Sequence, residues 1–239
     1  MDAVPGDVFA IFGSDSSDDD AAVLPPQPLL VSSFPPLQHC WELVASRETD
    51  GGKGLRATAN IREGAEIHRE GAALRAPNGH AAASREAALA LHKQCVLARF
   101  DRLPAAARDA LMVLYSRDTY NDADDNATIY GVFQTNSVRL SGRDECDGGV
   151  FLVMCRMNHA CRPNVAYIWR PDLQKLLLVA KRDISAGEEL YTTYLSRGVG
   201  MDTTAERRAH LLREFGFHCM CGLCVQSDAP QEARPVSVA

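Results

Sequence analysis

Several features that would indicate a membrane-bound or secreted protein are absent from this 239-residue sequence. No stretch approaches the roughly 20 consecutive apolar residues that a membrane-spanning helix needs, so we expect no membrane association. The N-terminus lacks the basic and apolar regions of a secretory signal, which predicts a reducing compartment. No basic import cluster stands out, so we expect a nuclear location, a cytoplasmic location, or both. In a reducing compartment, clustered cysteines indicate metal binding or redox chemistry rather than disulfides.

Lysine, arginine and glutamate are absent from residues 1–40, whereas six aspartates and six of the twelve prolines lie there. Such a segment buries little apolar surface, so we predict a disordered acidic, proline-rich arm. Apolar residues around Val23 and Phe34 leave a short docking contact open as an alternative to a solvated tail. Residues 41–239 carry 25 acidic and 25 basic side chains. This balance argues against direct nucleic-acid binding, which needs a basic surface.

The rest of the chain is long enough for one sizeable domain in which strands and helices are grouped. Apolar and β-branched runs predict strands at 41–45, 55–61, 65–67, 128–140, 150–154, 165–170, 175–180 and 188–194, with a turn at 51–54. Ser84 and Pro104 begin two predicted helices. A capping box at Thr203 and Glu206 begins a third, which Gly216 ends. Because helices do not alternate with strands, we predict an α+β fold.

Three of the eight cysteines form the most informative motif in the chain. Cys219, Cys221 and Cys224 have a C-x-C-x2-C spacing that brings three thiolates within reach of one tetrahedral metal ion, most simply zinc. A closed zinc site needs a fourth ligand, and our hypothesis is that Cys161 supplies it and ties the C-terminal segment to an upstream loop. An incidental thiol cluster is the alternative. The other cysteines show no clustering, and we interpret them as packed thiols: Cys40, Cys95, Cys146 and Cys155.

Five short motifs occur in a fixed order, of which the last is the cysteine triad. The other four are Gly52-Lys53-Gly54-Leu55, Thr135-Asn136-Ser137, the run from Met157 to Asn164 (MNHACRPN), and the run from Gly187 to Tyr194 (GEELYTTY). Together they resemble the SET-domain protein lysine methyltransferases, above all the SMYD-like branch and the fungal-type SET proteins near it. The resemblance runs from about Trp41 to Cys224.

Two departures from the SMYD pattern leave target preference open. The segment from Ile67 to Ala83 contains no cysteine, so a zinc-binding MYND module is not expected there. Only about fifteen residues follow Cys224, too few for the helical lobe of that branch. The resemblance therefore implies a SET domain at 41–195 with a helical insertion at about 81–121. A helix with a cysteine-rich post-SET segment follows at 196–226, and then a tail at 227–239.

The resemblance also implies a mostly-β SET fold with a knot-like crossing, where the loop at 158–164 passes the strand ending at Tyr194. S-adenosylmethionine would bind beside this crossing, and one structural Zn²⁺ would bind the four cysteines. The implied cofactor-binding residues are Lys53, Gly54, Leu55, Asn136, Asn158, His159, Tyr194 and Phe217. Tyr194 would be the catalytic residue and, with Tyr191, would line the channel for the substrate lysine. Glu188 and Glu189 are interpreted as surface carboxylates.

The predicted function is S-adenosylmethionine-dependent methylation of lysine in a histone or another protein, by a monomeric enzyme. A free lysine of pKa about 10.4 is neutral only about once in 2,500 molecules at pH 7, so an apolar, aromatic channel would favour the reactive amine. The Tyr194 hydroxyl would act by orientation and electrostatics. A catalytically silent SET module that binds a partner is the main alternative. The all-cysteine ligand set argues against a third possibility, a zinc hydrolase.

Overall fold

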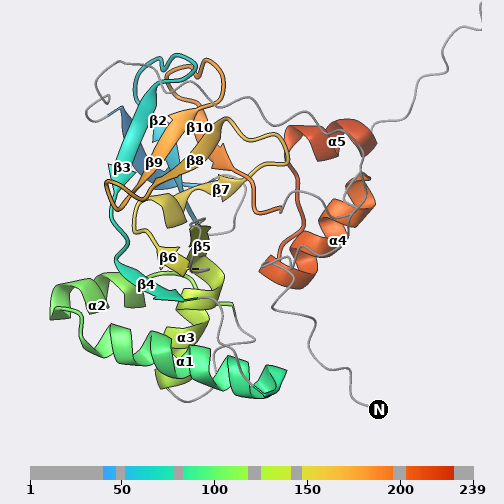
Figure 1. Ribbon diagram of the computed structural model, residues 1–239. Coiled ribbons are helices and arrows are strands. Elements are labelled where there is room, and N and C mark those ends of the chain that lie inside the picture. Colours follow the sequence, from blue (N-terminus) through green and yellow to red (C-terminus); the bar gives the residue numbers. More distant parts are fainter. Residues whose placement is uncertain are drawn as a thin grey trace, which may run out of the picture.

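The computed structural model describes residues 40–46, 52–77, 83–117, 125–140, 147–195 and 203–228, and the statements below concern these residues. Nearly all of the predicted N-terminal arm and most of the predicted C-terminal tail lie outside them. Figure 1 shows the strands on one side of the molecule, three helices below them and two C-terminal helices to the right. This grouping confirms the predicted α+β class. No helix in the described ranges has both the length and the apolar character needed to cross a membrane.

The described strands form three small sheets. The first contains, in spatial order, β1 (Trp41–Ala45), β2 (Lys53–Ala57), β10 (Glu189–Thr192) and β7 (Asn158–His159). The second contains β3 (Glu66–Glu70), β9 (Lys175–Ala180) and β8 (Val165–Arg170). The third contains β4 (Leu74–Pro77), β6 (Asp147–Val150) and β5 (Ser137–Leu140).

Strand β7 is the element that brings the predicted motif loop to its site. It runs parallel to β10, with Asn158 opposite Tyr191 and His159 opposite Thr192. The Ala160 amide extends this pairing by donating to the carbonyl of Thr192 at 2.8 Å. The loop that begins at Asn158 therefore lies beside the strand that leads to Tyr194.

The described residues form five α-helices, namely α1 (Arg85–Asp101), α2 (Ala105–Met112), α3 (Asp125–Asn136), α4 (Thr204–Phe215) and α5 (Gly222–Asp228). Three of these helices, α1, α2 and α4, begin where the sequence predicted. The Ser84 hydroxyl accepts from the Ala87 amide at 3.2 Å, which confirms the predicted cap of α1. Thr203 and Glu206 form the predicted capping box of α4. Gly216 ends α4 with a φ of 76°, a left-handed conformation that glycine adopts without strain.

Two large apolar clusters stabilise the scaffold. The first lies among the strands and includes Leu55, Phe151 and Leu178, each at most 1% exposed. The second joins α1, α2 and α3 to β4 and β6, with Phe133 and Val150 fully buried. Burying one such side chain contributes about 1.5–3 kcal/mol, so these clusters hold the sheets and the helical part together.

The predicted strand at 128–140 is wrong over most of its length. Residues up to Asn136 belong to α3, and only Ser137–Leu140 form a strand, β5. The β-branched residues in this segment favoured a strand, but Tyr130, Val132 and Phe133 are buried in the cluster shared with α1. Tertiary packing thus overrides local propensity, and the helical part reaches Asn136 rather than residue 121.

The predicted strand at 150–154 is also wrong beyond Val150, where β6 ends. The run is buried as expected, but it turns into a short 3₁₀ helix, η3 (Met154–Arg156). The Glu70 carboxylate accepts from the amides of Val153 at 3.1 Å and Met154 at 2.8 Å, and these bonds fix the turn. The predicted turn at 51–54 likewise ends early, because Lys53 and Gly54 already belong to β2.

Candidate functional site

A cavity of about 700 Å³ lies where the sheets, the helical part and the C-terminal segment meet. Its size falls in the range of about 300–1,000 Å³ that small-molecule sites occupy. Segments far apart in the sequence line it, chiefly 114–115, 134–139, 154–159, 193–195 and 215–220. Six of the eight residues predicted to bind the cofactor line this one cavity: Lys53, Asn136, Asn158, His159, Tyr194 and Phe217.

Tyr194 lies at the centre of an aromatic group in this cavity. Its hydroxyl donates to the Met157 carbonyl at 2.8 Å. Its ring packs against Phe215 at 4.9 Å and stands edge-on to Phe217 at 6.2 Å between centroids. Burial raises the pKa of the Tyr194 phenol above its usual range. The hydroxyl is therefore held protonated, as a fixed dipole rather than a base.

His159 is buried, with 4% of its surface exposed, and uses both ring nitrogens within the protein. Its Nδ1 accepts from the backbone N–H of Tyr194 at 3.0 Å. Its Nε2 lies 3.4 Å from Sγ of Cys161. The imidazole thus lies between the aromatic group and the cysteines.

Asn136 and Asn158 use their side-chain nitrogens for hydrogen bonds within the protein. The Asn158 amide nitrogen donates to Oε1 of Glu189 at 2.8 Å and to the Lys53 carbonyl at 3.3 Å. The Asn136 nitrogen donates to the carbonyls of Tyr115 at 2.7 Å and Val132 at 2.8 Å. Since both N–H bonds of each amide are used inside the protein, a ligand meets Oδ1, an acceptor. This is narrower than the sequence prediction, which gave the amides both donor and acceptor roles.

The predicted Gly-Lys-Gly-Leu motif reaches the cavity only at its first two residues, Gly52 and Lys53. A side chain at Gly54 would collide with the Glu189 carboxylate and the Asn158 amide, so glycine is required for this close packing. The side chain of Leu55 is 1% exposed and belongs to the strand core. Its side chain does not contribute to the lining of the cavity.

Tyr191 lies apart from the cavity lining, among the apolar residues that pack on the cysteines. Its backbone amide donates to the Asn164 side chain at 2.7 Å. Phe217 contacts both sites, because it lines the cavity and packs on the same cluster. The C-terminal segment therefore forms one wall of the cavity through Phe217.

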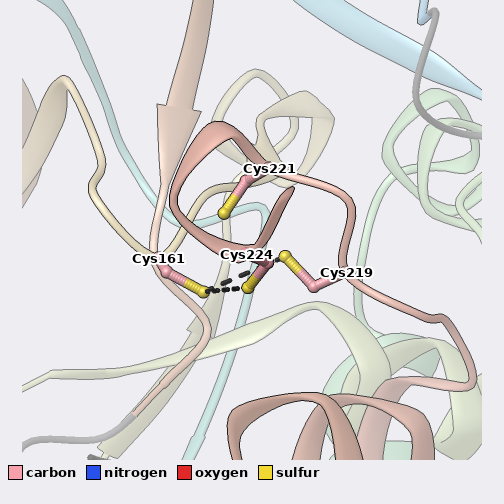
Figure 2. A group of neighbouring side chains, drawn as sticks. All are labelled: Cys161, Cys219, Cys221 and Cys224. Atoms are coloured by element: carbon pink, nitrogen blue, oxygen red, sulfur yellow. Dashed lines mark hydrogen bonds between the residues drawn. The ribbon is translucent and has the colours of Figure 1, made fainter. Parts of the chain in front are cut away.

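Four cysteine sulfurs come together from the motif loop and the C-terminal segment. Figure 2 shows Cys161, Cys219, Cys221 and Cys224, whose Sγ atoms all lie within 4.8 Å of one another. The Cys161 sulfur lies 3.6 Å from that of Cys224 and 3.9 Å from that of Cys219. Four thiolates at about 2.3 Å from a tetrahedral zinc ion lie about 3.8 Å apart. The donor set and its spacing therefore fit zinc.

Positive charge and hydrogen-bond donors surround this cysteine cluster. Nη2 of Arg207 lies 3.9 Å from Sγ of Cys224. Burial lowers the pKa of the Arg207 guanidinium, whereas hydrogen bonds to Cys161 and Cys224 raise it. The hydrogen bonds have the larger combined effect, so the pKa is raised. The bond from Cys219 lowers the pKa of the Cys161 thiol to about 3, with a further contribution from His159. The surroundings thus favour the thiolate, the form that binds metal, at Cys161. The bond with Cys161 raises the pKa of Cys219, and burial raises the pKa of Cys224, so these two favour the thiol when no metal is bound.

Three residues of the site were missed or misread in the sequence. Tyr167 of β8 lines the cavity, and burial raises its pKa well above the usual value. Cys155 also lines it, with its pKa raised to about 12 by burial, so its thiol is unreactive at neutral pH. Glu189 is half-buried, and its carboxylate accepts from the Asn158 amide, a role that the sequence did not show. Successive side chains of a strand point to opposite faces of its sheet, so the sequence of β8 and β10 showed which residues share a face with Tyr167 and with Glu189. It did not show which of the two faces meets a cavity.

Comparison with known proteins agrees with this geometry. The SET-domain family matches residues 52–195, more than half of the chain. The chain belongs to the SET-domain family. The matched segment includes five of the cavity residues discussed above, namely Lys53, Asn136, Asn158, His159 and Tyr194.

The similar proteins include enzymes named for histone methylation. The chain is 42% identical over 101 residues to histone-lysine N-methyltransferase set5 of Schizosaccharomyces pombe, a match covering 42% of this chain and 30% of that one. It is 30% identical over 122 residues to histone-lysine N-methyltransferase SMYD3 of Homo sapiens, covering 48% and 27%. It is 27% identical over 139 residues to the putative SET domain-containing protein L678 of Acanthamoeba polyphaga mimivirus, covering 57% and 49%. The chain thus spans less than a third of the first two proteins.

Proposed function

We propose that this protein is an S-adenosylmethionine-dependent protein-lysine N-methyltransferase. The observation that carries the proposal is that one cavity of a SET domain is lined by Asn158 and His159, from β7, and by Tyr194, which follows β10. The relatives named histone-lysine N-methyltransferases support the same chemistry. We extend the proposal to the finer architecture, a knot-like crossing of 158–164 with β10, which the parallel β7–β10 pairing supports.

The residues that line the cavity fit the proposed cofactor. Two acceptor oxygens, Oδ1 of Asn136 and Oδ1 of Asn158, suit the ammonium group at its methionine end. Arg139 and Arg156 line the same cavity and supply positive charge for the carboxylate. The ring of Phe217 offers an apolar surface to the rest of the molecule. When bound, S-adenosylmethionine supplies an electrophilic methyl group on a sulfonium centre.

The chain's own residues prepare the amine that receives this methyl. Methyl transfer needs a neutral lysine, and the rings of Tyr194, Phe215 and Phe217 create an apolar site that disfavours the ammonium form. Tyr194 does not remove the proton, because its own pKa is raised and its hydroxyl donates to Met157. Water therefore takes the lysine proton before the amine is enclosed. The tyrosine then orients the amine through the fixed oxygen of its hydroxyl.

A zinc ion in the cysteine cluster would serve a structural role. Four thiolates leave no open coordination position for water or substrate. The proposed ligands Cys161, Cys219, Cys221 and Cys224 would fix the C-terminal segment on the motif loop, and with it the Phe217 wall. Binding at such sites releases on the order of 10–16 kcal/mol, which is enough to decide whether this segment is ordered.

The proposed partner is a protein that presents a lysine, with histones as the first candidates because of the names of the relatives. A histone substrate would place the protein in the nucleus. The 25 acidic and 25 basic side chains of residues 41–239 give no basic excess for nucleic-acid binding. We propose that the enzyme acts as a monomer on protein substrates.

Methyl transfer from radiolabelled S-adenosylmethionine tests this proposal directly. The purified full chain is incubated with core histones and, separately, with a proteome extract, and the labelled bands are analysed by mass spectrometry. Label on lysine side chains is the expected result. Calorimetry with the cofactor is run in parallel. Absence of both label and heat of binding would show a silent SET module instead.

A further inference from the structure

His159 contacts both a proposed zinc ligand, Cys161, and the backbone of the proposed catalytic residue, Tyr194. Its Nε2 faces Sγ of Cys161 at 3.4 Å, and its Nδ1 faces the amide of Tyr194 at 3.0 Å. The two contacts lie on opposite edges of one buried ring. A rigid ring with both edges engaged transmits a displacement from one partner to the other.

The partners determine which nitrogen carries the proton. The backbone N–H of Tyr194 can only donate, so Nδ1 of His159 is the acceptor. In neutral imidazole the proton is then on Nε2, which donates toward the Cys161 sulfur. A metal-bound thiolate is a good acceptor for such a donor.

Packing holds the ring in this position. His159 pairs with Thr192 across the β7–β10 ladder, which fixes its backbone next to β10. The centroid of its ring lies 5.3 Å from that of Tyr194 and 6.0 Å from that of Phe217. With 4% of its surface exposed, the ring has little room to turn.

We propose that His159 is a positioning residue that couples the metal-bound Cys161 to the backbone of Tyr194, so that metal binding sets the position of the tyrosine. The inference rests on the proposed function for the role of Tyr194, and on the proposed zinc for the state of Cys161. In this proposal zinc has two effects. It fixes the Phe217 wall of the cavity, and through the imidazole of His159 it also sets the position of the segment after β10 that carries Tyr194.

Three substitutions separate the two contacts. His159→Asn keeps an acceptor near the position of Nδ1 and removes the donor to Cys161. His159→Gln keeps a donor near the position of Nε2 and removes the acceptor for Tyr194. His159→Phe removes both and keeps an aromatic ring. His68→Gln is the control, because His68 lies in β3 against Trp41 and lines neither the cavity nor the cysteine cluster.

Zinc affinity and the Tyr194 amide resonance are measured for each full-length protein, the former by competition with a chromophoric chelator. We expect His159→Asn and His159→Phe to weaken zinc binding about 10-fold or more, while His159→Gln stays within about 3-fold of wild type. We expect the ¹⁵N–¹H resonance of Tyr194 in the zinc-loaded proteins to move in the Gln and Phe variants and to stay near its wild-type position in the Asn variant. The control should leave both quantities unchanged.

The wild-type protein gives a test that does not depend on variants folding. A long-range ¹⁵N–¹H spectrum of the zinc-loaded protein should show His159 protonated at Nε2 only. Protonation at Nδ1 would overturn the proposal, as would wild-type zinc affinity in all three His159 variants. Neither readout needs turnover, so failure of the methyl-transfer assay would reject the proposed function and leave this inference to be decided separately.

Discussion

Two regions of the molecule are stabilised by different forces. One is the apolar core among the strands, here called the strand core, and the other is the C-terminal lobe of α4 and α5 that carries Cys219, Cys221 and Cys224. Among the described residues, sixteen buried side chains form the strand core, and nearly all of them are aliphatic or aromatic. The lobe around α4 and α5 has five buried residues in its cluster, and three of these are cysteines. Burial of apolar surface is enough to hold the first region. The second buries fewer apolar side chains, so we propose that metal binding by the cysteines contributes to its order.

The cavity combines these two unequal regions. Tyr194 and Asn158 come from the strands, whereas Phe217 comes from the lobe. We therefore propose that the side of the active site built on the strands keeps its structure without metal, whereas the Phe217 wall depends on the cysteine cluster. The four experiments below test this difference, beginning with the largest expected effect.

Removing the metal should separate the two regions most clearly. We expect Cys221→Ser, or exhaustive chelation, to weaken cofactor binding more than about 100-fold, because the Phe217 wall is lost. Amide protection in β8 and β9 should persist. Calorimetry and hydrogen exchange measure the two effects, with Cys95→Ser in α1 as the matched control. Loss of protection in β8 and β9 together with the lobe would show that the two regions are a single cooperative unit.

Damage to the strand core should have the opposite pattern. Phe151 is fully buried and packs edge-on against Trp169 at 6.2 Å. We expect Phe151→Ala to lower the free energy of unfolding by about 3–5 kcal/mol. Zinc affinity of the folded protein should remain close to wild type. Denaturant titration and chelator competition measure these quantities, and Leu173→Ala, at a residue 44% exposed, is the control.

Tyr194→Phe tests the chemistry where the regions meet. We expect kcat for methyl transfer to fall about 100-fold, equivalent to about 2.7 kcal/mol, because the orienting hydroxyl is lost. Zinc content should not change, since the backbone contact of Tyr194 with His159 remains. Steady-state kinetics and metal analysis decide the outcome. A kcat within about 2-fold of wild type would remove the assigned role of this hydroxyl.

Mild acid should lower the stability of both regions slightly, through His68 in the strands and His210 in α4. Burial lowers the pKa of His68 in the strands and of His210 in α4. The unfolded chain then binds protons that the folded chain does not, so stability decreases as pH falls through the unfolded value of about 6.5 toward the lower folded values.

For a single proton, the slope cannot exceed about 1.4 kcal/mol per pH unit. His68→Gln and His210→Gln should each flatten the decrease as pH falls from about 7 through about 6.5 and below, as measured by urea unfolding of zinc-loaded protein. If stability rises on acidification, the burial argument fails for both residues.

Local signals predicted the elements whose stability is local. The capping box at Thr203, the stop at Gly216 and the hairpin of β8 and β9 need only residues within a few positions, and the structure confirms each. The sequence prediction was wrong for α3, because packing against α1 has a larger effect than the strand propensity of its β-branched residues. It was also wrong after Val150, where a distant carboxylate, Glu70, ends the strand.

Within the site, the motif residues were predicted as a set because their spacing carries the resemblance. The sequence placed Asn136, Asn158, His159, Tyr194 and Phe217 in one site, and the structure brings these five to one cavity. Tyr167 and Arg207 were not predicted, because their neighbours in the sequence do not show which face of β8 or of α4 meets the site. Their roles arise from contacts with residues far away in the sequence.

The sequence by itself determined that Cys219, Cys221 and Cys224 lie within reach of one another, since their spacing does not depend on the fold around them. Only the tertiary structure brought the sulfur of Cys161 to them. The sequence also determined the helix ends and the main hairpin, since these depend on interactions between near neighbours. Only the tertiary structure decided which nitrogen of His159 faces which partner, and that Asn136 and Asn158 present oxygen rather than nitrogen. A polar side chain takes its direction from the donors and acceptors around it, and those come from strands and loops that meet only in the folded chain.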